Sequence, residues 1–180
     1  MIVSLVAAIT ADGFIGREAN DRSFDWTSTE DSRFYVSSIK KADAIVMGST
    51  TFKGINLHPR NSHYVIYSRK PENFINPRPE VITAEATNVS PKQLMAKLKK
   101  DGRQDIVIAG GSSIYKMFIQ SDVIDVLNII IEPVFFKKGT LLFKDVSFEK
   151  ATVSFELISE EKLNDQGTIL QEWRRKSKEA

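Results

Sequence analysis

Short runs of apolar and β-branched residues recur along the chain and predict a series of strands. The first run, residues 2–9, is apolar at nearly every position, which is typical of a central strand covered on both faces. The sequence Asp165-Gln166-Gly167 indicates a hairpin turn between the last two runs. The other runs cover residues 44–47, 64–67, 81–83, 106–109, 123–131, 152–158 and 168–173.

Between these runs lie segments with helical patterning. Residues 28–41 carry apolar positions on one side and charges elsewhere. Ser90-Pro91 combines an N-cap residue with a first-turn proline and predicts a helix that ends at Asp101-Gly102. A third helix is predicted to begin near Ser112 and to continue through Phe118, and a short one is expected between the second and third strands.

The order of these elements predicts the fold class. Strands and helices alternate through the first two thirds of the chain, which indicates parallel strands joined by crossover helices. The last two strands form a hairpin and add antiparallel pairing at one edge. We therefore predict a three-layer α/β fold with a mixed, mostly parallel sheet and a C-terminal antiparallel hairpin. No internal repeat is present, so a single domain over residues 1–180 is the simplest interpretation.

Composition excludes several classes of protein. The 42% hydrophobic and 27% charged residues are typical of a globular chain. The chain has no cysteine, and His58 and His63 lack the spacing of a zinc-binding helix, so no metal site is predicted. A formal charge of +2 gives no basis for a nucleic-acid partner. The N-terminus lacks a basic leader, and no apolar run is long enough to cross a bilayer, so we expect a cytoplasmic protein with no membrane partner.

Two strand ends share one local design. Gly48-Ser49-Thr50-Thr51 follows the run 44–47, and Gly110-Gly111-Ser112-Ser113 follows 106–109. Glycine lets an anion approach the backbone, and the first turn of a helix offers unpaired N–H groups. Two such corners at the carboxyl ends of parallel strands could hold the two phosphates of a dinucleotide. Alternatively, each corner simply forms and caps a tight turn.

A third strand end carries Ser68-Arg69-Lys70, directly after the run 64–67. A hydroxyl group and two cations would suit an additional phosphate, such as the 2′-phosphate that distinguishes NADPH from NADH. The alternative is an ordinary exposed basic loop.

Glu30 is the main candidate acid. It lies four residues before Phe34, so both side chains project from one face of a helix, where they could hold and protonate a flat heterocycle. Alternatively, Thr27 and Glu30 form a capping box, in which Glu30 only reaches back to the N-cap amide. Asp31 is a rival acid, and Ser28 with Asp31 offers a poorer version of the same cap. Local reasoning does not separate these alternatives.

Three further features could border a site. The glycines of Asp12-Gly13-Phe14-Ile15-Gly16 bracket apolar residues, as in a flap over a cleft or in an ordinary turn. Trp26 could form a pocket wall or fill the core. Arg60 could bind a carboxylate or phosphate through its guanidinium group, or lie in a solvated loop.

Taken together, these segments resemble the dihydrofolate reductase superfamily over nearly the whole chain. The strand 6–9 followed by Asp12, Ile15 and Gly16 resembles the opening of that superfamily, and Glu30 with Phe34 resembles its substrate-binding acid and aromatic residue. Three further segments carry the resemblance: 46–52 with its Met-Gly element, 57–61, which resembles the superfamily's Leu-Pro-x-Arg-x-Asn stretch, and 108–115 with its paired glycines.

Within the superfamily, several features resemble the reductase domain of the bifunctional riboflavin-biosynthesis deaminase-reductase. They are Ala11-Asp12-Gly13, Trp26-Thr27-Ser28 before the acids, and Ile131-Glu132-Pro133-Val134 before 139–143. Some positions depart from the patterns: Ser49 stands where dihydrofolate reductases usually carry Arg, Ile131 stands roughly where they carry Thr, and only Gly139 remains of a riboflavin-type Gly-x-Gly. The zinc ligands of a deaminase domain are absent.

The resemblance implies an NADPH-dependent oxidoreductase that acts on a small nitrogen heterocycle. The implied activity is most like 5-amino-6-(5-phosphoribosylamino)uracil reductase; the alternatives are a dihydrofolate or pterin reductase and a non-catalytic nucleotide-binding module. A homodimer is expected from the riboflavin branch. The implied catalytic acid is Glu30, and the implied substrate-binding residues are Trp26, Asp31, Phe34 and Arg60. The implied cofactor-binding residues are Ala8, Ile15, Gly16, Gly48, Ser49, Thr50, Thr51, Ser68, Arg69, Ala109, Gly110, Gly111, Ser112, Ser113, Ile114 and Tyr115.

Overall fold

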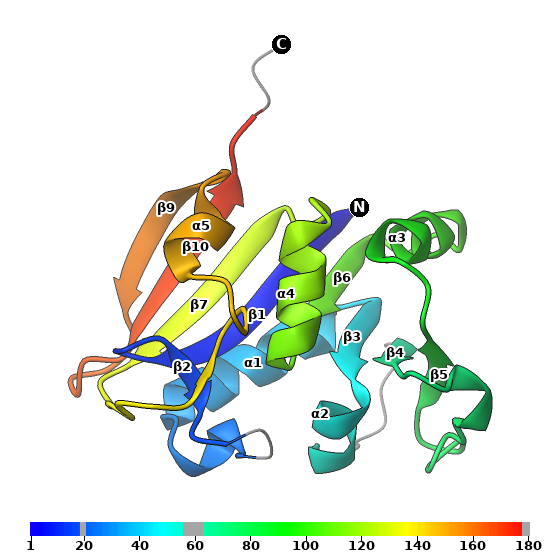
Figure 1. The fold of residues 1–180 in the computed structure, drawn as a ribbon, viewed down its shortest axis with the longest axis horizontal. Coiled ribbons are helices and arrows are strands. Elements are labelled where there is room, and N and C mark those ends of the chain that lie inside the picture. Colours follow the sequence, from blue (N-terminus) through cyan, green and yellow to red (C-terminus); the bar gives the residue numbers. More distant parts are fainter. Residues whose placement is uncertain (19–20, 56–62, 178–180) are drawn as a thin grey trace.

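A computed structural model describes residues 1–18, 21–55 and 63–177, and its centre is an eight-stranded sheet (Figure 1). The strand order is β5-β4-β3-β6-β1-β7-β10-β9. Strands β5 to β7 in this order are parallel, whereas β10 runs antiparallel to both β7 and β9. The predicted mixed sheet with a C-terminal hairpin is therefore confirmed. The strands are β1 (Ile2–Thr10), β3 (Ala44–Gly48), β4 (His63–Tyr67), β5 (Thr83–Thr87), β6 (Asp105–Ile108), β7 (Val126–Glu132), β9 (Phe155–Lys162) and β10 (Ile169–Arg175).

Helices cover both faces of this sheet (Figure 1). One face carries α1 (Thr29–Lys41) and α2 (Ser49–Gly54). The other face carries α3 (Pro91–Lys100), α4 (Ser112–Gln120) and α5 (Phe148–Thr152). The predicted helices 28–41, from Ser90-Pro91 and from Ser112 are confirmed. Within the described ranges, no helix combines the length and apolar character that crossing a membrane requires.

The continuous apolar runs of the parallel strands fill both layers between sheet and helices. In β3, Ile45 and Met47 belong to the core cluster beneath α1 and α2, whereas Ala44 and Val46 belong to the cluster beneath α3 and α4. Successive side chains of a strand point to opposite faces, so an uninterrupted apolar run supplies both clusters.

Several predicted strand boundaries are wrong because a turn and a short helix occupy part of the expected runs. The expected strand 81–83 is a turn, in which the amides of Val81 and Ile82 both donate to the Arg78 carbonyl, and β5 begins only at Thr83. The expected strand 152–158 begins at Phe155, because α5 occupies Phe148–Thr152. A five-residue helix is too short to show a clear helical period in the sequence.

A small second sheet stands beside the main one. The segment expected to form a flap or a turn contains β2 (Phe14–Gly16), which pairs with β8 (Thr140–Leu141). Asp12 anchors it by accepting hydrogen bonds from the Lys137 amide at 2.7 Å and the Phe136 amide at 3.2 Å. The two strands approach closely: a Cβ atom at Gly139 would lie 2.4 Å from the Gly16 carbonyl oxygen.

We expect Gly139→Ala to separate β2 from β8, because backbone atoms cannot yield as a flexible side chain would. Overpacking of this kind typically costs about 1–3 kcal/mol, which lowers the melting temperature of a chain of this size by several degrees. Thermal unfolding followed by circular dichroism measures this. Gly54→Ala is the matched control, because no heavy atom lies within 4 Å of the added Cβ. Equal melting temperatures for the two variants would contradict the close approach.

Candidate functional site

A cavity of about 580 Å³ opens near the carboxyl ends of the parallel strands. β6 ends at Ile108, opposite Leu5, whereas β1 continues beside β7 as far as Thr10. Beyond Leu5, β1 therefore has no paired strand on its β6 side, and residues 6–8 line the cavity. Crevices at this position of an open α/β sheet are the usual ligand sites, and the volume suits a small-molecule ligand.

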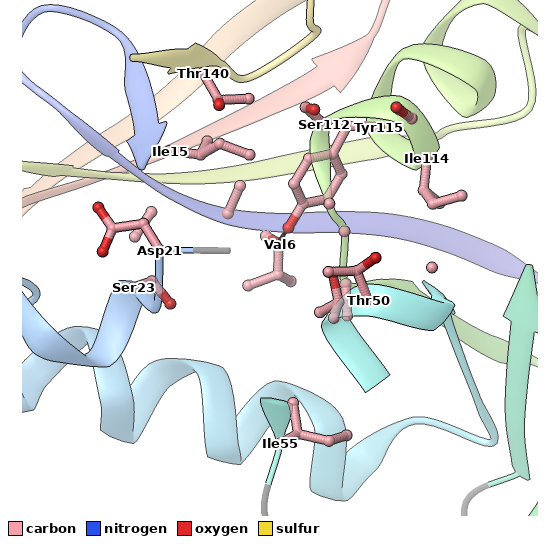
Figure 2. Close-up of a pocket in the computed structure, with 18 of the residues that line it drawn as sticks. Val6, Ile15, Asp21, Ser23, Thr50, Ile55, Ser112, Ile114, Tyr115 and Thr140 are labelled. Carbon is pink, nitrogen blue, oxygen red and sulfur yellow. Dashed lines mark hydrogen bonds between the residues drawn. The ribbon is translucent and has the colours of Figure 1, made fainter. Parts of the chain in front are cut away.

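The two glycine-hydroxyl corners meet at this cavity. The Gly48 amide donates a hydrogen bond of 2.7 Å to the Gly110 carbonyl. A Cβ atom at Gly111 would lie 3.4 Å from the Thr51 hydroxyl oxygen. Both corners line the cavity, and Figure 2 shows Thr50 and Ser112 at its edge. The expected proximity of the corners is thus confirmed.

The start of α4 is shaped to receive a negatively charged group. Its N-cap is Gly111, which provides no side chain to satisfy the first amides. Ser112 and Ser113, in the first turn, line the cavity. Unpaired amides and the positive end of the helix dipole favour an anion at such a position. α2 begins in the same way with Gly48 as an N-cap that makes no side-chain hydrogen bond.

Tyr115 fixes the second corner against the sheet. Its buried hydroxyl donates a 2.7 Å hydrogen bond to the Val6 carbonyl, so the ring spans from α4 to β1 (Figure 2). Gly110 has a φ of +97°, and a Cβ there would lie 2.8 Å from the Tyr115 hydroxyl oxygen. Only glycine therefore fits at this position.

The end of β4 supplies two further groups to the cavity. The Tyr67 hydroxyl is buried and has no hydrogen-bond partner among the described residues. Burial raises the pKa of Tyr67 to about 12, so the hydroxyl stays neutral and can donate. Arg69 also lines the cavity, whereas Ser68 does not, and the Ser68 hydroxyl accepts a hydrogen bond from the Lys70 amide at 3.2 Å.

A buried acid lines the cavity from the side of α1. Asp31 is only 5% exposed. Burial raises the pKa of Asp31 to about 6, opposed by the Thr27 hydroxyl and assisted by the negative charge of Glu132. Such a carboxyl group exchanges its proton near neutral pH, which suits a general acid. Tyr35, four residues further along the same helix face, lines the cavity beside it.

Glu30, the acid that the sequence favours, does not line the cavity. Its carboxylate accepts a 3.1 Å hydrogen bond from the Asn164 side-chain amide and lies 3.7 Å from the Arg33 guanidinium. The Asn164 amide, the backbone amide of Glu30 and the charge of Arg33 lower the pKa of Glu30, so it is ionised at neutral pH. The capping box with Thr27 does not form, because Ser28 is the N-cap and its hydroxyl accepts from the Asp31 amide.

The remaining predicted substrate residues are not brought together. Trp26 packs edge-on against Phe136, with ring centroids 5.1 Å apart, and its indole N–H has no partner among the described residues. Phe34 packs against the core cluster beneath α1 and α2. Neither residue lines the cavity, and Arg60 lies outside the described residues.

The predicted cofactor residues are brought together: all of them except Gly16 and Ser68 line the cavity. Ile15 of β2 and Thr140 of β8 lie together at one side, away from Ile55 (Figure 2). In the part of the chain that the structure describes, no three His, Asp or Glu side chains are placed to hold a metal ion. The sequence analysis did not single out Val6, Ala7, Glu18, Asp21, Ser23, Phe24, Tyr35, Ile55, Tyr67 or Thr140 as cavity residues. Only Tyr35 carried a readable signal, its four-residue spacing from Asp31.

The sequence of this chain matches that of known proteins. The profile of the family described as RibD C-terminal domain matches residues 1–169. The chain is 26% identical over 149 residues to the uncharacterised protein YwjB of Bacillus subtilis, covering 78% of this chain and 82% of that protein.

Solved structures share the fold. One is a deaminase/5-amino-6-(5-phosphoribosylamino)uracil reductase from Thermotoga maritima, with a TM-score of 0.77 and 20% identity over 97% of this chain. The chain spans 56% of the length of that bifunctional protein. Another is a dihydrofolate reductase from Enterococcus faecalis complexed with NADP(H), with a TM-score of 0.71 and 17% identity, covering 98% of this chain and 97% of that chain. At these identities the likeness shows the fold alone.

The raised pKa of Asp31 predicts a stability effect that depends on pH. A rise in pKa from 3.8 to about 6 corresponds to about 3 kcal/mol in the free energy of unfolding. The native state loses this stability as pH increases from 3.8 through 6, because the buried carboxyl group ionises. We therefore expect Asp31→Asn to be more stable than the wild type at pH 8, with the difference vanishing towards pH 4. Urea unfolding at several pH values measures this.

Asp43→Asn is the control of opposite sign. The Gln104 and Asp105 amides donate to Asp43 at 2.7 and 3.0 Å and lower its pKa. The ionised form therefore stabilises the native state above the ordinary pKa, and this variant should be less stable than the wild type at pH 8. A destabilised Asp31→Asn protein at pH 8 would contradict the burial of a charged Asp31.

Proposed function

Because the chain belongs to the family of the RibD C-terminal domain, we propose that it is an NADPH-dependent reductase of a small nitrogen heterocycle. One observation carries the proposal: two adjoining glycine corners and a buried acid line the same cavity. The corners suit the phosphates of a dinucleotide, and the acid suits proton delivery to a substrate.

The residues present fit the cofactor. Gly48 to Thr51 and Gly110 to Ser113 would hold its phosphates through backbone amides and hydroxyl groups. The buried Tyr67 hydroxyl offers an unused donor, and Arg69 offers a charge for a 2′-phosphate. When bound, a reduced nicotinamide supplies a hydride for reduction. Ala8 and Ile15, which both line the cavity, would border that ring.

Asp31 would hold and deliver the proton that accompanies the reduction. Its carboxyl group lines the cavity, is shielded from water and remains partly protonated near neutral pH. Glu30 does not line the cavity, and its lowered pKa leaves it ionised at neutral pH. The proposed catalytic acid is therefore Asp31, and Glu30 becomes a residue that ties α1 to Asn164.

Two substrate classes remain within this activity. The family supports a ribosylaminouracil phosphate, whose phosphate group needs a cation. Arg60, which the sequence suggests for that role, lies outside the described residues, and Arg33 is 76% exposed, pairs with Glu30 and does not line the cavity. The buried carboxyl of Asp31 favours a second candidate, a pterin, whose amidine-like edge pairs with a carboxylate.

We expect the protein to bind NADPH saturably below millimolar concentration, as measured by nucleotide fluorescence. Arg69→Ala should weaken NADPH binding by about tenfold, the usual effect of losing one charge-assisted contact, and should leave NADH binding nearly unchanged. Lys70→Ala is the matched control, because this neighbouring cation does not line the cavity. Absence of saturable binding would remove the enzyme assignment.

Turnover separates the two acids. With NADPH and a panel of pterins and aminouracils, loss of absorbance from the reduced nicotinamide reports reduction. Asp31→Asn should lose at least 100-fold in turnover, the usual contribution of a general acid being about 10²–10⁴, while still binding NADPH. Glu30→Gln should keep most of its turnover. The reverse order of the two variants would return the catalytic role to Glu30.

A further inference from the structure

A second buried carboxyl group interacts with the proposed acid, Asp31. Glu132, at the end of β7, is only 3% exposed and does not line the cavity. We infer that Glu132 is a positioning residue that holds Asp31 in place and keeps it protonated for catalysis. This inference rests on the proposed function, in which Asp31 donates the proton.

Three hydrogen bonds fix the Glu132 carboxylate. Its Oε1 accepts from the Ser28 amide at 2.8 Å and from the Ser28 hydroxyl at 2.7 Å. Its Oε2 accepts from the Thr168 hydroxyl at 2.7 Å, and Thr168 is itself buried. A buried carboxylate that accepts several hydrogen bonds keeps a defined position. Glu132 thereby joins β7 to the start of α1 and to the residue before β10.

The contact with Ser28 transmits this position to Asp31. The Ser28 hydroxyl donates to Glu132 and accepts a 3.2 Å hydrogen bond from the Asp31 amide. Ser28 is the N-cap of α1, and Asp31 is the third residue of the helix. These hydrogen bonds fix the position and rotation of the first turn of α1 relative to β7. That rotation determines that Asp31 rather than Glu30 lines the cavity.

The turn before β10 completes the support. The Asn164 side-chain amide donates to the Thr168 hydroxyl at 2.9 Å and to the Glu30 carboxylate at 3.1 Å. The Thr168 amide donates back to the Asn164 side-chain oxygen at 3.0 Å. Both acids at the start of α1 are thus connected to this turn, Glu30 directly and Asp31 through Glu132 and Ser28.

Glu132 also acts on Asp31 through its charge. The groups that act on Asp31 are the Thr27 hydroxyl and Glu132 from β7, and Asp31 acts in turn on Tyr115 from α4. Burial, Tyr35 and Asp31 itself raise the pKa of Tyr115, which stays neutral, so Glu132 is the charged neighbour. Like charges within a buried site disfavour ionisation of the second carboxyl. The other charged residues that line the cavity are Glu18, Asp21 and Arg69. Arg17 lies 3.7 Å from Asp21, and the Glu30–Arg33 pair does not line the cavity.

Glu132→Gln tests the inference because Gln keeps the shape and most of the hydrogen bonds but removes the charge. As pH is raised, NADPH oxidation by this variant should decline at a lower pH than in the wild type, because Asp31 ionises more readily. We expect equal turnover at pH 5 and several-fold lower turnover at pH 7.5. Glu161→Gln, the same change on the exposed strand β9, is the control and should follow the wild type.

A structural role alone would lower turnover by the same factor at both pH values, and that result would overturn the inference. An unchanged profile would overturn it as well. If NADPH neither binds nor is oxidised, the proposed function fails instead, and the titration of Asp31 still decides the inference. Carbon-13 NMR of the side-chain carboxyl groups should show the Asp31 midpoint at lower pH in Glu132→Gln.

Asp31→Asn gives the reciprocal measurement without any change at Glu132. In the wild type, the carboxyl carbon of Glu132 should show a step in chemical shift at the midpoint of Asp31, because coupled groups sense each other's ionisation. That step should be absent in Asp31→Asn. A Glu132 resonance that is indifferent to Asp31 would overturn the inference even if Glu132→Gln did not fold.

Discussion

The backbone hydrogen bond from the Gly48 amide to the Gly110 carbonyl joins the two strand ends on which the cavity depends. β3 and β6 both stop there and turn into helices, while β1 continues past them. The cavity is the space left beside β1 by that early stop. Its walls are therefore set by strand length, and glycine at the corners keeps side chains out of it.

The acid end depends on a different constraint, the phase of one helix. Successive residues of an α-helix point about 100° apart, so the choice of N-cap decides which neighbouring carboxyl group faces inwards. With Ser28 as the cap, Asp31 faces the cavity and Glu30 faces Asn164. The two acids then differ in protonation, because burial raises the pKa of Asp31 whereas the hydrogen bond from the Asn164 amide lowers the pKa of Glu30.

The sequence was informative where one local pattern decides the outcome. The apolar runs predicted the parallel strands, Ser90-Pro91 predicted the start of α3, and the two glycine corners were found with their helices. It was uninformative where contacts across the chain decide. The Ser28 amide donates to Glu132, 104 residues away, and this contact occupies the N-cap amide that a capping box would offer to Asp31. Tyr67 and Thr140 reach the cavity only through the order of strands, which no local spacing reveals.

One wall of the cavity stands outside the main sheet. Ile15 and Thr140 come from β2 and β8, a ribbon of two short strands that rests on Asp12 and on the close approach of Gly139. Such a ribbon has few backbone hydrogen bonds, so it can open locally without disturbing the eight-stranded core. The Ile15 and Thr140 side of the cavity therefore depends on a ribbon with few hydrogen bonds and not on the eight-stranded sheet. Substitutions in this ribbon would therefore act first on this wall of the cavity and only indirectly on the pairing of the main sheet.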